Sequence, residues 1–395
     1  MSKRLSYFVV AGKTASADQW AGLMMIAALG FALFCVNSPL KPAYDLFQHT
    51  QVVVSFGDFV LHQSLLEWIN EGLMAFFFLS VTLEIKREVL EGHLSGPRQM
   101  LLPVIAAIGG IMVPAGMYLM INQNTPELMH GWAIPTATDI ALSLGILSLL
   151  GSRVPLELKL FLAALAIFDD LGGILIIALF YGSQLTLGIL VLSLLGIVGL
   201  FVLNRFAVSR ASLYMVIGFF LWLTFQESGI HPTIAGVAVG LALPLRLDLP
   251  RANIPLLFVE KGLHFWVAFF VVPLFAFFNA GIDLSDTSIK TLGSPVTLGI
   301  MVGLVIGKPV GILGFAWLSN AIGLTTLADH VNWRLMTGVA LLGGMGFTMA
   351  LFFNSLAFSG NGSLEMGRVA ILTGSLVSGF AGFFWLRYSL SQSQS

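Results

Sequence analysis

Cysteine and charge are both scarce in this sequence. Cys35 is the only cysteine among 395 residues, which excludes an intramolecular disulfide. No cysteine or histidine pair has the spacing of a zinc site and no HExxH motif occurs, so we expect neither a structural metal nor a zinc protease. Charged residues make up 10% of the chain, well below the roughly 25% of a soluble globular domain.

Hydrophobic residues, by contrast, make up 57% of the chain, so most side chains must face lipid or one another. Apolar runs close to the roughly 20 residues that cross a bilayer as a helix recur throughout. They lie at 20–37, 65–83, 100–121, 132–150, 156–181, 184–204, 211–225, 231–246, 262–281, 294–318, 333–357 and 364–386. We therefore predict an all-α integral membrane protein of about twelve spans, because only a helix satisfies its backbone groups within one apolar segment.

The positive charges predict the orientation of these spans. Lys41, Lys290 and Arg368 fall on one side of the predicted membrane, Lys308 lies within a run, and the rest of the 19 lysines and arginines fall on the other side. This bias places both termini in the cytoplasm and favours an even number of spans. Because no low-complexity linker divides the chain, we expect residues 1–395 to form a single membrane domain.

Two stretches outside the runs carry their own predictions. Residues 1–19 lack the apolar core of a cleaved signal peptide, so we expect a short interfacial helix on the cytoplasmic side. Within the outer region at 45–64, QVVVSFGDFVLH (51–62) alternates around a Gly-Asp pair, which favours a small β-hairpin over an ordered loop. An exposed hairpin edge can pair with the same edge of a second copy, so we expect a homodimer.

Ionisable residues inside the runs mark the expected chemistry. A charged side chain at the bilayer centre costs roughly 2.5–3.5 kcal/mol, so each one needs a partner, a wet cavity or a proton. Asp139, Asp169, Asp170 and Lys308 meet this description. Lys308 can stay charged opposite a carboxylate, and its apolar flanks make snorkelling to an interface the weaker interpretation.

Two runs are interrupted, and the interruptions correspond. In GWAIPTATDIALSLG (131–145), Pro135 and the threonines around Thr138 predict an opened helix rather than a simple kink. In ALLGGMGFTMALFF (340–353), Gly343, Gly344 and Gly346 weaken the helix, although glycines in membranes also serve as packing surfaces.

These interruptions fall in the fourth and eleventh runs, the middle members of three-run sets at 100–181 and 294–386. The correspondence predicts inverted-topology repeats whose opened helices cross at the bilayer midplane. Opened helices of this kind form the binding site in several families of secondary transporters, and the family that this sequence resembles is one of them.

Several segments resemble the bacterial Na+/H+ antiporter family NhaA. The similarity covers nearly the whole chain in the same order, and its most specific motifs are TATD (136–139) and FDDLGG (168–173). The other matching segments are LEWINEGLMAFFFLSVTLEIKREVLEG (66–92), SGIHPTIAGV (228–237), VVPLFAFFNAG (271–281), IGKPVGI (306–312) and GGMGFTMALF (343–352). The resemblance implies a location in the bacterial inner (plasma) membrane.

The resemblance also implies roles for individual residues. Asp170 and Asp169 match the family's carboxylates for Na+ or Li+ and protons, with Asp170 the essential ion ligand and Asp169 the partner of Lys308. Asp139 and Thr138 match the aspartate and threonine of its first opened helix. Its cytoplasmic cluster linked to pH activation is matched by Glu84, Arg87, Glu88, Glu260 and His264.

Two positions depart from the best-known family pattern. Glu71 stands where an aspartate is usual in the cytoplasmic funnel, which barely alters charge. Lys261 stands where a histidine is usual, which removes a titratable imidazole and leaves the pH midpoint open.

The residues support an exchange mechanism independently of the family. Sodium is a hard cation that favours oxygen ligands, which carboxylates and a threonine hydroxyl supply. Burial favours the protonated acid and a bound cation favours the ionised one, so the two ions compete for one site. We expect a secondary active, electrogenic antiporter that exports Na+ or Li+ for inward-moving H+ by alternating access and is activated by rising pH.

Other protein classes fit less well. A Na+ or H+ channel shares the composition and stays the alternative. An intramembrane aspartyl protease needs two carboxylates near 3 Å apart, whereas adjacent helical residues such as Asp169 and Asp170 point about 100° apart. A purely structural protein would not need these buried charges. We therefore expect no enzymatic activity, no cofactor beyond the transported ions and no nucleic-acid partner.

Overall fold

The computed structural model describes residues 20–56, 59–92, 96–182, 186–245, 254–285, 293–328, 330–358 and 362–392. The predicted interfacial helix at 1–19 lies outside these ranges. The chain divides into two compact units, one formed by Met1–Asn37, Gly96–Asp170 and Asn279–Ser395, the other by Ser38–Ser95 and Leu171–Phe278. The prediction of a single membrane domain stays a prediction.

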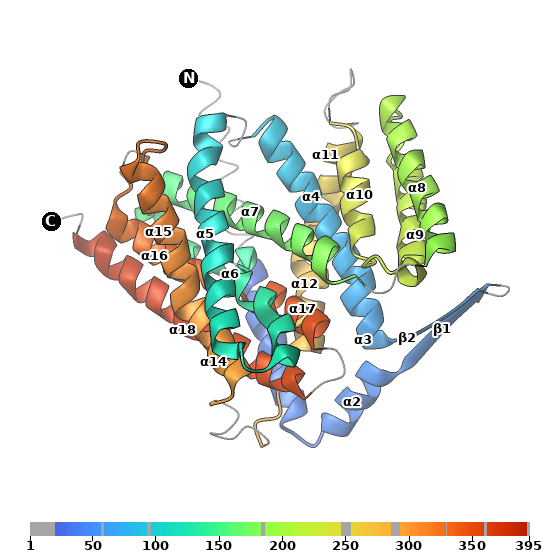
Figure 1. The fold of residues 1–395 in the computed structure, drawn as a ribbon, viewed down its shortest axis with the longest axis horizontal. Helices are drawn as coiled ribbons and strands as arrows, with labels where there is room; N and C mark the ends of the chain where they lie inside the picture. Colours follow the sequence, from blue (N-terminus) through green and yellow to red (C-terminus); the bar gives the residue numbers. More distant parts are fainter. Residues whose placement is uncertain are drawn as a thin grey trace. The chain divides into compact units, whose positions relative to one another are not determined.

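The first unit holds both interrupted helices (Figure 1). It contains the helix Trp20–Val36, α5 (Pro97–Asn122), η2 (Pro126–Thr136), α6 (Ile140–Leu149), η3 (Gly151–Arg153) and the first part of α7 (Leu156–Phe180). It also contains α14 (Pro295–Val302), η6 (Gly303–Gly307), α15 (Lys308–Ala321), α16 (Trp333–Gly343), α17 (Phe347–Ala357) and α18 (Ser363–Gln392).

The second unit combines the hairpin with a helical group. Its strands are β1 (Gln51–Phe56) and β2 (Phe59–Ser64). Its helices are α2 (Lys41–His49), α3 (Leu65–Glu67), η1 (Trp68–Leu73), α4 (Met74–Leu90), α8 (Leu187–Arg205), α9 (Ala211–Ser228), α10 (Ile234–Ala242), α11 (Pro255–Trp266), η5 (Val267–Val271) and α12 (Val272–Asn279). Its core includes buried leucines of α4, aromatic residues of α9, and Ala235 and Val239 of α10.

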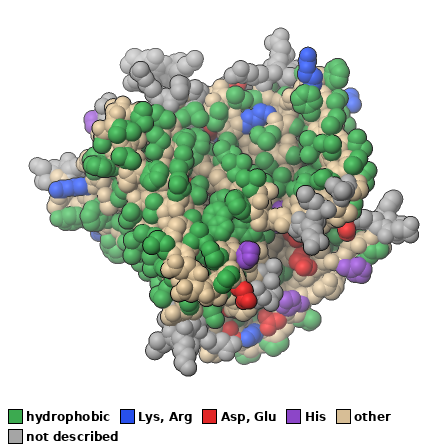
Figure 2. Space-filling model, viewed as in Figure 1, with side chains coloured by type: hydrophobic (Ala, Val, Ile, Leu, Met, Phe, Trp, Pro, Cys, Tyr) green, Lys and Arg blue, Asp and Glu red, His purple; other side chains and the backbone are tan. Residues whose placement is uncertain are grey.

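Every predicted apolar run coincides with a helix or a bent helix pair. Within the described ranges, seven helices are long and apolar enough to cross a membrane, or up to ten if each of three bent pairs is one span. The runs at 211–225 and 231–246 correspond to α9 and to the short α10. Hydrophobic side chains predominate on the visible face (Figure 2). A helical membrane protein is thus confirmed, while the full number of spans stays a prediction.

Both predicted interruptions are present. The η2 helix ends at Thr136, Ala137 is extended, and α6 begins after Asp139 with a bend of 42°. The α16 helix ends at Gly343 and α17 begins at Phe347, also with a bend of 42°. Proline and threonine at the first break, and glycine at the second, remove the local support for a continuous helix.

The predicted hairpin is confirmed as a two-stranded antiparallel sheet whose register pairs Gln51 with Ser64 and Val54 with Leu61. Its Gly-Asp turn lies outside the described residues. A capping box joins the sheet to α3, since Ser64 accepts from the Glu67 N–H while the Glu67 side chain accepts from the Ser64 N–H. This box begins the helical span Leu65–Leu90.

Helices α5 and α15 pack closely side by side (Figure 1). A Cβ atom on Gly109 would collide with the carbonyl oxygen of Gly311, and one on Gly311 with that of Gly109, so the two backbones touch there. One residue on, the position of a Cβ on Gly110 is 3.5 Å from Cε of Lys308. Small residues on α5 therefore make room for the Lys308 side chain.

Candidate ion-binding site

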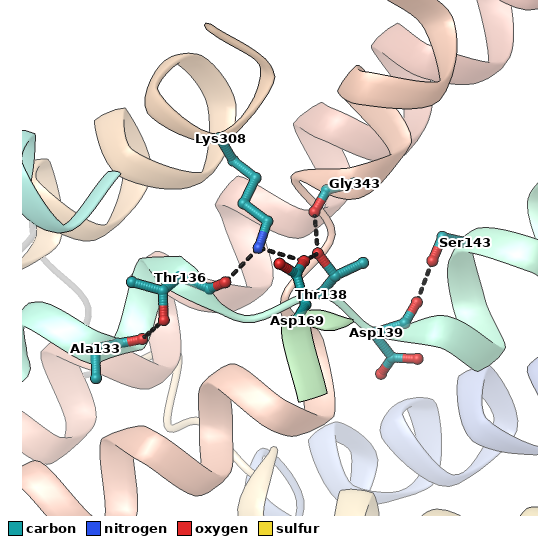
Figure 3. Close-up of polar contacts among 8 residues, drawn as sticks. All are labelled: Ala133, Thr136, Thr138, Asp139, Ser143, Asp169, Lys308 and Gly343. Atoms are coloured by element: carbon teal, nitrogen blue, oxygen red, sulfur yellow. Dashed lines mark hydrogen bonds and ion pairs between the residues drawn. The ribbon is translucent and has the colours of Figure 1, made fainter. Parts of the chain in front are cut away.

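The centre of the site is a buried ion pair between α15 and α7. Nζ of Lys308 lies 2.6 Å from Oδ2 of Asp169, and both side chains are 0% exposed. Lys308 also donates to the carbonyl oxygen of Thr136, which the end of η2 leaves without a helical donor (Figure 3). The lysine therefore bridges a carboxylate and the first opened helix.

Thr138 connects this ion pair to the second opened helix. Its hydroxyl oxygen lies 2.6 Å from Oδ2 of Asp169 and 2.8 Å from the carbonyl oxygen of Gly343, the last residue of α16. A hydroxyl has one proton, so Thr138 donates to one of these acceptors at a time. The lone pairs of the hydroxyl oxygen stay available to a cation.

Asp139 joins the two breaks by its side chain and its backbone. Oδ1 accepts from the Leu142 N–H at 3.0 Å and so caps α6. Oδ2 accepts from both the N–H and the hydroxyl of Thr348, at 3.1 and 2.6 Å. The Asp139 N–H donates to the carbonyl oxygen of Met345 at 2.6 Å. One carboxylate thus offsets the positive N-terminal ends of both α6 and α17.

The charge of the site is unbalanced. Asp139, Asp169 and Asp170 are 2%, 4% and 3% exposed, and Lys308 supplies one positive charge. When all are ionised, the excess negative charge in a poorly solvated region favours the uptake of a cation or a proton. Asp169 and Asp170 follow each other on α7, so their side chains point in different directions.

The predicted cytoplasmic cluster forms in the second unit. Arg87 on α4 contacts Glu88 at 2.5 Å and, through Nε, Glu260 of α11 at 2.7 Å. Glu84 interacts electrostatically with Arg87, Glu260 and His264. The neighbouring Lys261 is exposed. The structure therefore brings the predicted cluster together around one arginine.

Glu71 lies apart from that cluster, and its predicted place in a cytoplasmic funnel stays a prediction. Its Oε2 accepts from Nε2 of Gln63 on β2 at 2.6 Å, so it lies at the hairpin end of the span. Glu84 follows on the same helical span, which rises about 1.5 Å per residue, so the two carboxylates are roughly 20 Å apart.

Sequence reasoning missed three groups at the site. They are Thr348, the carbonyl oxygen of Met345, and Ser143, whose hydroxyl donates to the Asp139 carbonyl oxygen (Figure 3). Thr348 follows GGMGF directly, which is the first turn of a helix that restarts after a break. That position could have identified it as a polar group near the other opened helix.

Two interrupted helices that meet at buried carboxylates and a lysine define the class of protein. Membrane chains of this kind are secondary transporters, and the bacterial Na+/H+ antiporters that the sequence resembles are known examples of the class. A family model described as Na+/H+ antiporter 1 matches residues 13–386, and the chain belongs to that family.

Curated relatives agree with the family match. The Na(+)/H(+) antiporter NhaA of Pseudomonas putida (strain GB-1) is 49% identical over 366 residues, which cover 92% of this chain and 93% of the relative. That of Sulfurovum sp. (strain NBC37-1) is 46% identical over 370 residues, covering 93% and 94%. That of Shewanella oneidensis is 46% identical over 373 residues, covering 94% and 95%. The predicted resemblance is confirmed.

Proposed function

We propose that this chain is a secondary active antiporter that exports Na+ or Li+ in exchange for inward-moving H+. Family membership supports the exchange of Na+ and H+. The structural observation that carries the proposal is the buried Asp169–Lys308 pair, which Thr138 links to the second opened helix. A buried ion pair beside two opened helices fits a site that exchanges a metal ion for protons.

Competition between the ions follows from the groups at the site. Carboxylate oxygens of Asp170 and Asp169, with the hydroxyl of Thr138, are ligands that suit a small hard cation. The same carboxylates take up protons when no cation is present, because burial disfavours their unpaired charge. Na+ or Li+ binding therefore expels protons, and protons expel the metal ion.

Exchange by alternating access follows if the site faces one side at a time. The carrier then crosses with either the metal ion or protons, since an empty charged site is costly to move through the bilayer. Electrogenic exchange requires a second proton for each metal ion. Asp169 and Lys308 are the two candidate carriers of that proton, because each stabilises the charge of the other only while they are paired.

The proposed architecture has twelve spans and two inverted three-helix repeats at 100–181 and 294–386. Each set consists of a long helix, a pair bent by 42° and another long helix, which supports the repeat. The breaks bond to each other through Asp139, Met345 and Thr348, as opened helices crossing at the bilayer midplane would.

We propose that the Arg87 cluster activates transport as pH rises. It contains Glu84, Glu88, Glu260 and His264 around the arginine, a set of ionisable groups that lie close together on α4 and α11. The exposed Lys261 adds positive charge beside it. Both termini and this cluster are proposed to lie on the cytoplasmic side of the bacterial inner membrane.

We propose a homodimer formed through the hairpin. Val53, Val54 and Val60 are 50%, 45% and 42% exposed, which is unusual for apolar residues of a two-stranded sheet. Among the described residues the sheet has two strands, so each strand has an outer edge that no third strand pairs. A second copy would pair one edge and cover Val53 and Val60, which lie on the same face of the sheet.

The decisive test is ion exchange by the Asp170→Asn variant in proteoliposomes. We expect wild-type protein to release protons on Na+ binding and to exchange Na+ for H+, with a rate that responds to membrane potential. The variant should bind neither Na+ nor Li+ and show no exchange. Normal exchange by Asp170→Asn would overturn the site, and flux without mutual competition between the ions would establish a channel instead.

A further inference from the structure

Helix α18 presents small residues to the second break. A Cβ on Gly382 would lie 2.7 Å from Cδ2 of Leu342, and one on Gly379 would lie 3.0 Å from Sδ of Met345. Both distances are shorter than ordinary contacts, so the α18 backbone lies directly against the residues where α16 ends. Two serines, Ser375 and Ser378, are among these small residues.

Ser375 supplies the N-terminal cap that α17 lacks. The N-cap residue Gly346 has no side chain to satisfy the first N–H groups. The N–H of Phe347 donates instead to Oγ of Ser375 at 3.1 Å, and the next N–H, that of Thr348, donates to Asp139. The two N–H groups are thus shared between α18 and the ion site.

Ser378 lies three residues further along α18 and is 0% exposed. Its hydroxyl has no hydrogen-bond partner in the part of the chain that the structure describes. Its Oγ is 2.7 Å from the position that a Cβ would take on Gly344, and the carbonyl oxygen of Leu304 also meets that position. A buried hydroxyl is normally paired, so this one needs a partner nearby.

Leu304 offers an acceptor that its own helix does not satisfy. It lies in the π-helix η6, where a carbonyl accepts from the N–H five residues on. For Leu304 that residue is Pro309, which has no N–H. The Lys308 N–H is already used by the Gly303 carbonyl. A donor without a partner and an acceptor without a helical donor therefore face the same side of Gly344.

We propose that Ser375 and Ser378 are positioning residues for the transport cycle. In the arrangement described here, Ser375 holds the second opened helix by capping α17. When that helix shifts during alternating access, Ser378 donates to the Leu304 carbonyl, which joins α18 to the segment that presents Lys308. Gly344 permits this contact because it has no side chain between the two oxygens. The inference rests on the proposed antiport.

Opposite shifts in the conformational equilibrium distinguish this proposal from general packing. Ser375→Ala weakens the arrangement described here, and Ser378→Ala weakens the alternative one. The two variants should therefore change the apparent Na+ affinity in opposite directions, each by roughly 2- to 10-fold, as one net hydrogen bond predicts. The measurement is Na+ titration by calorimetry and Na+-dependent exchange in proteoliposomes at one pH. Ser389→Ala, at a buried α18 position beyond the break, is the matched control and should leave both unchanged.

A double-mutant cycle tests the acceptor. Pro309→Ala gives Leu304 an intrahelical donor, so it should reduce the effect of Ser378→Ala, and Ser378→Thr, which keeps the hydroxyl, should stay closer to wild type than Ser378→Ala. Shifts of the same sign for the two serine variants, no shift, or additive effects with Pro309→Ala would each overturn the proposal. If the proposed antiport function is wrong, the wild-type protein itself will show no Na+/H+ exchange, which distinguishes that failure from failure of the serine proposal.

Discussion

Nζ of Lys308 lies 2.6 Å from Oδ2 of Asp169, and neither side chain is exposed. The lysine also donates a hydrogen bond to the backbone carbonyl oxygen of Thr136, and the aspartate also accepts one from the Thr138 hydroxyl. This pair therefore fixes the first opened helix to α7 and α15. A cation that binds Asp169 must compete with Lys308 for the carboxylate. The ion pair therefore contributes to the stability of the fold and also takes part in transport.

Removal of either partner should destabilise the fold strongly. Asp169→Asn leaves a buried ammonium opposite an amide, and Lys308→Met leaves a buried carboxylate without its cation. We expect each to lower the free energy of unfolding by about 3–5 kcal/mol, and the double variant to lose less than the sum. Thermal unfolding of the purified protein measures this. Additive losses would show that the two groups do not stabilise each other.

The sequence was sufficient for the framework of this fold. Runs of about 20 apolar residues predict helices because a bilayer imposes that length and leaves the backbone no other partner. Pro135 and the glycines at 343–346 mark both breaks, because proline and glycine remove local helical support. Alternating residues around Gly57 predict the hairpin for the same kind of local reason.

The sequence does not indicate which distant segments contact each other. Nothing local to Asp139 indicates that Thr348 donates to it, and nothing local to Phe347 indicates that Ser375 caps α17. Helix rotation and packing select such partners, and hydropathy does not report either.

Thr348 should be a functional residue of the site. Thr348→Val removes the hydroxyl that donates to Asp139 at 2.6 Å and keeps the backbone N–H. We expect the free energy of unfolding to fall by about 2 kcal/mol, as for a hydrogen bond to a charged group, and half-saturation by Na+ to shift. Thr337→Val is the matched control, because that hydroxyl donates only to the Trp333 carbonyl within α16. An equal effect of both changes would exclude a specific role for Thr348.

The exposed valines of the hairpin should control assembly. Val53→Lys and Val60→Lys place charge on an apolar surface that a second copy is proposed to cover. We expect the dimer to dissociate in detergent, as measured by light scattering during size-exclusion chromatography, with the ion site intact. Thr326→Lys, at an exposed position outside the hairpin, controls for added charge. A dimer that survives both valine changes would place the interface elsewhere.

Arg87 should set the pH at which transport begins. It is the cation that contacts Glu88 at 2.5 Å and Glu260 at 2.7 Å, and its side chain is 33% exposed. Because partly exposed pairs contribute at most about 1 kcal/mol, Arg87→Gln should change stability little. Glu84, however, loses a nearby positive charge, so we expect the activity profile to move to higher pH. Arg87→Lys keeps the charge and should move the profile less.

Exchange measured from pH 6 to 9 in proteoliposomes distinguishes the wild-type protein from the Arg87→Gln and Arg87→Lys variants. An unchanged profile in Arg87→Gln would mean that the cluster does not sense pH.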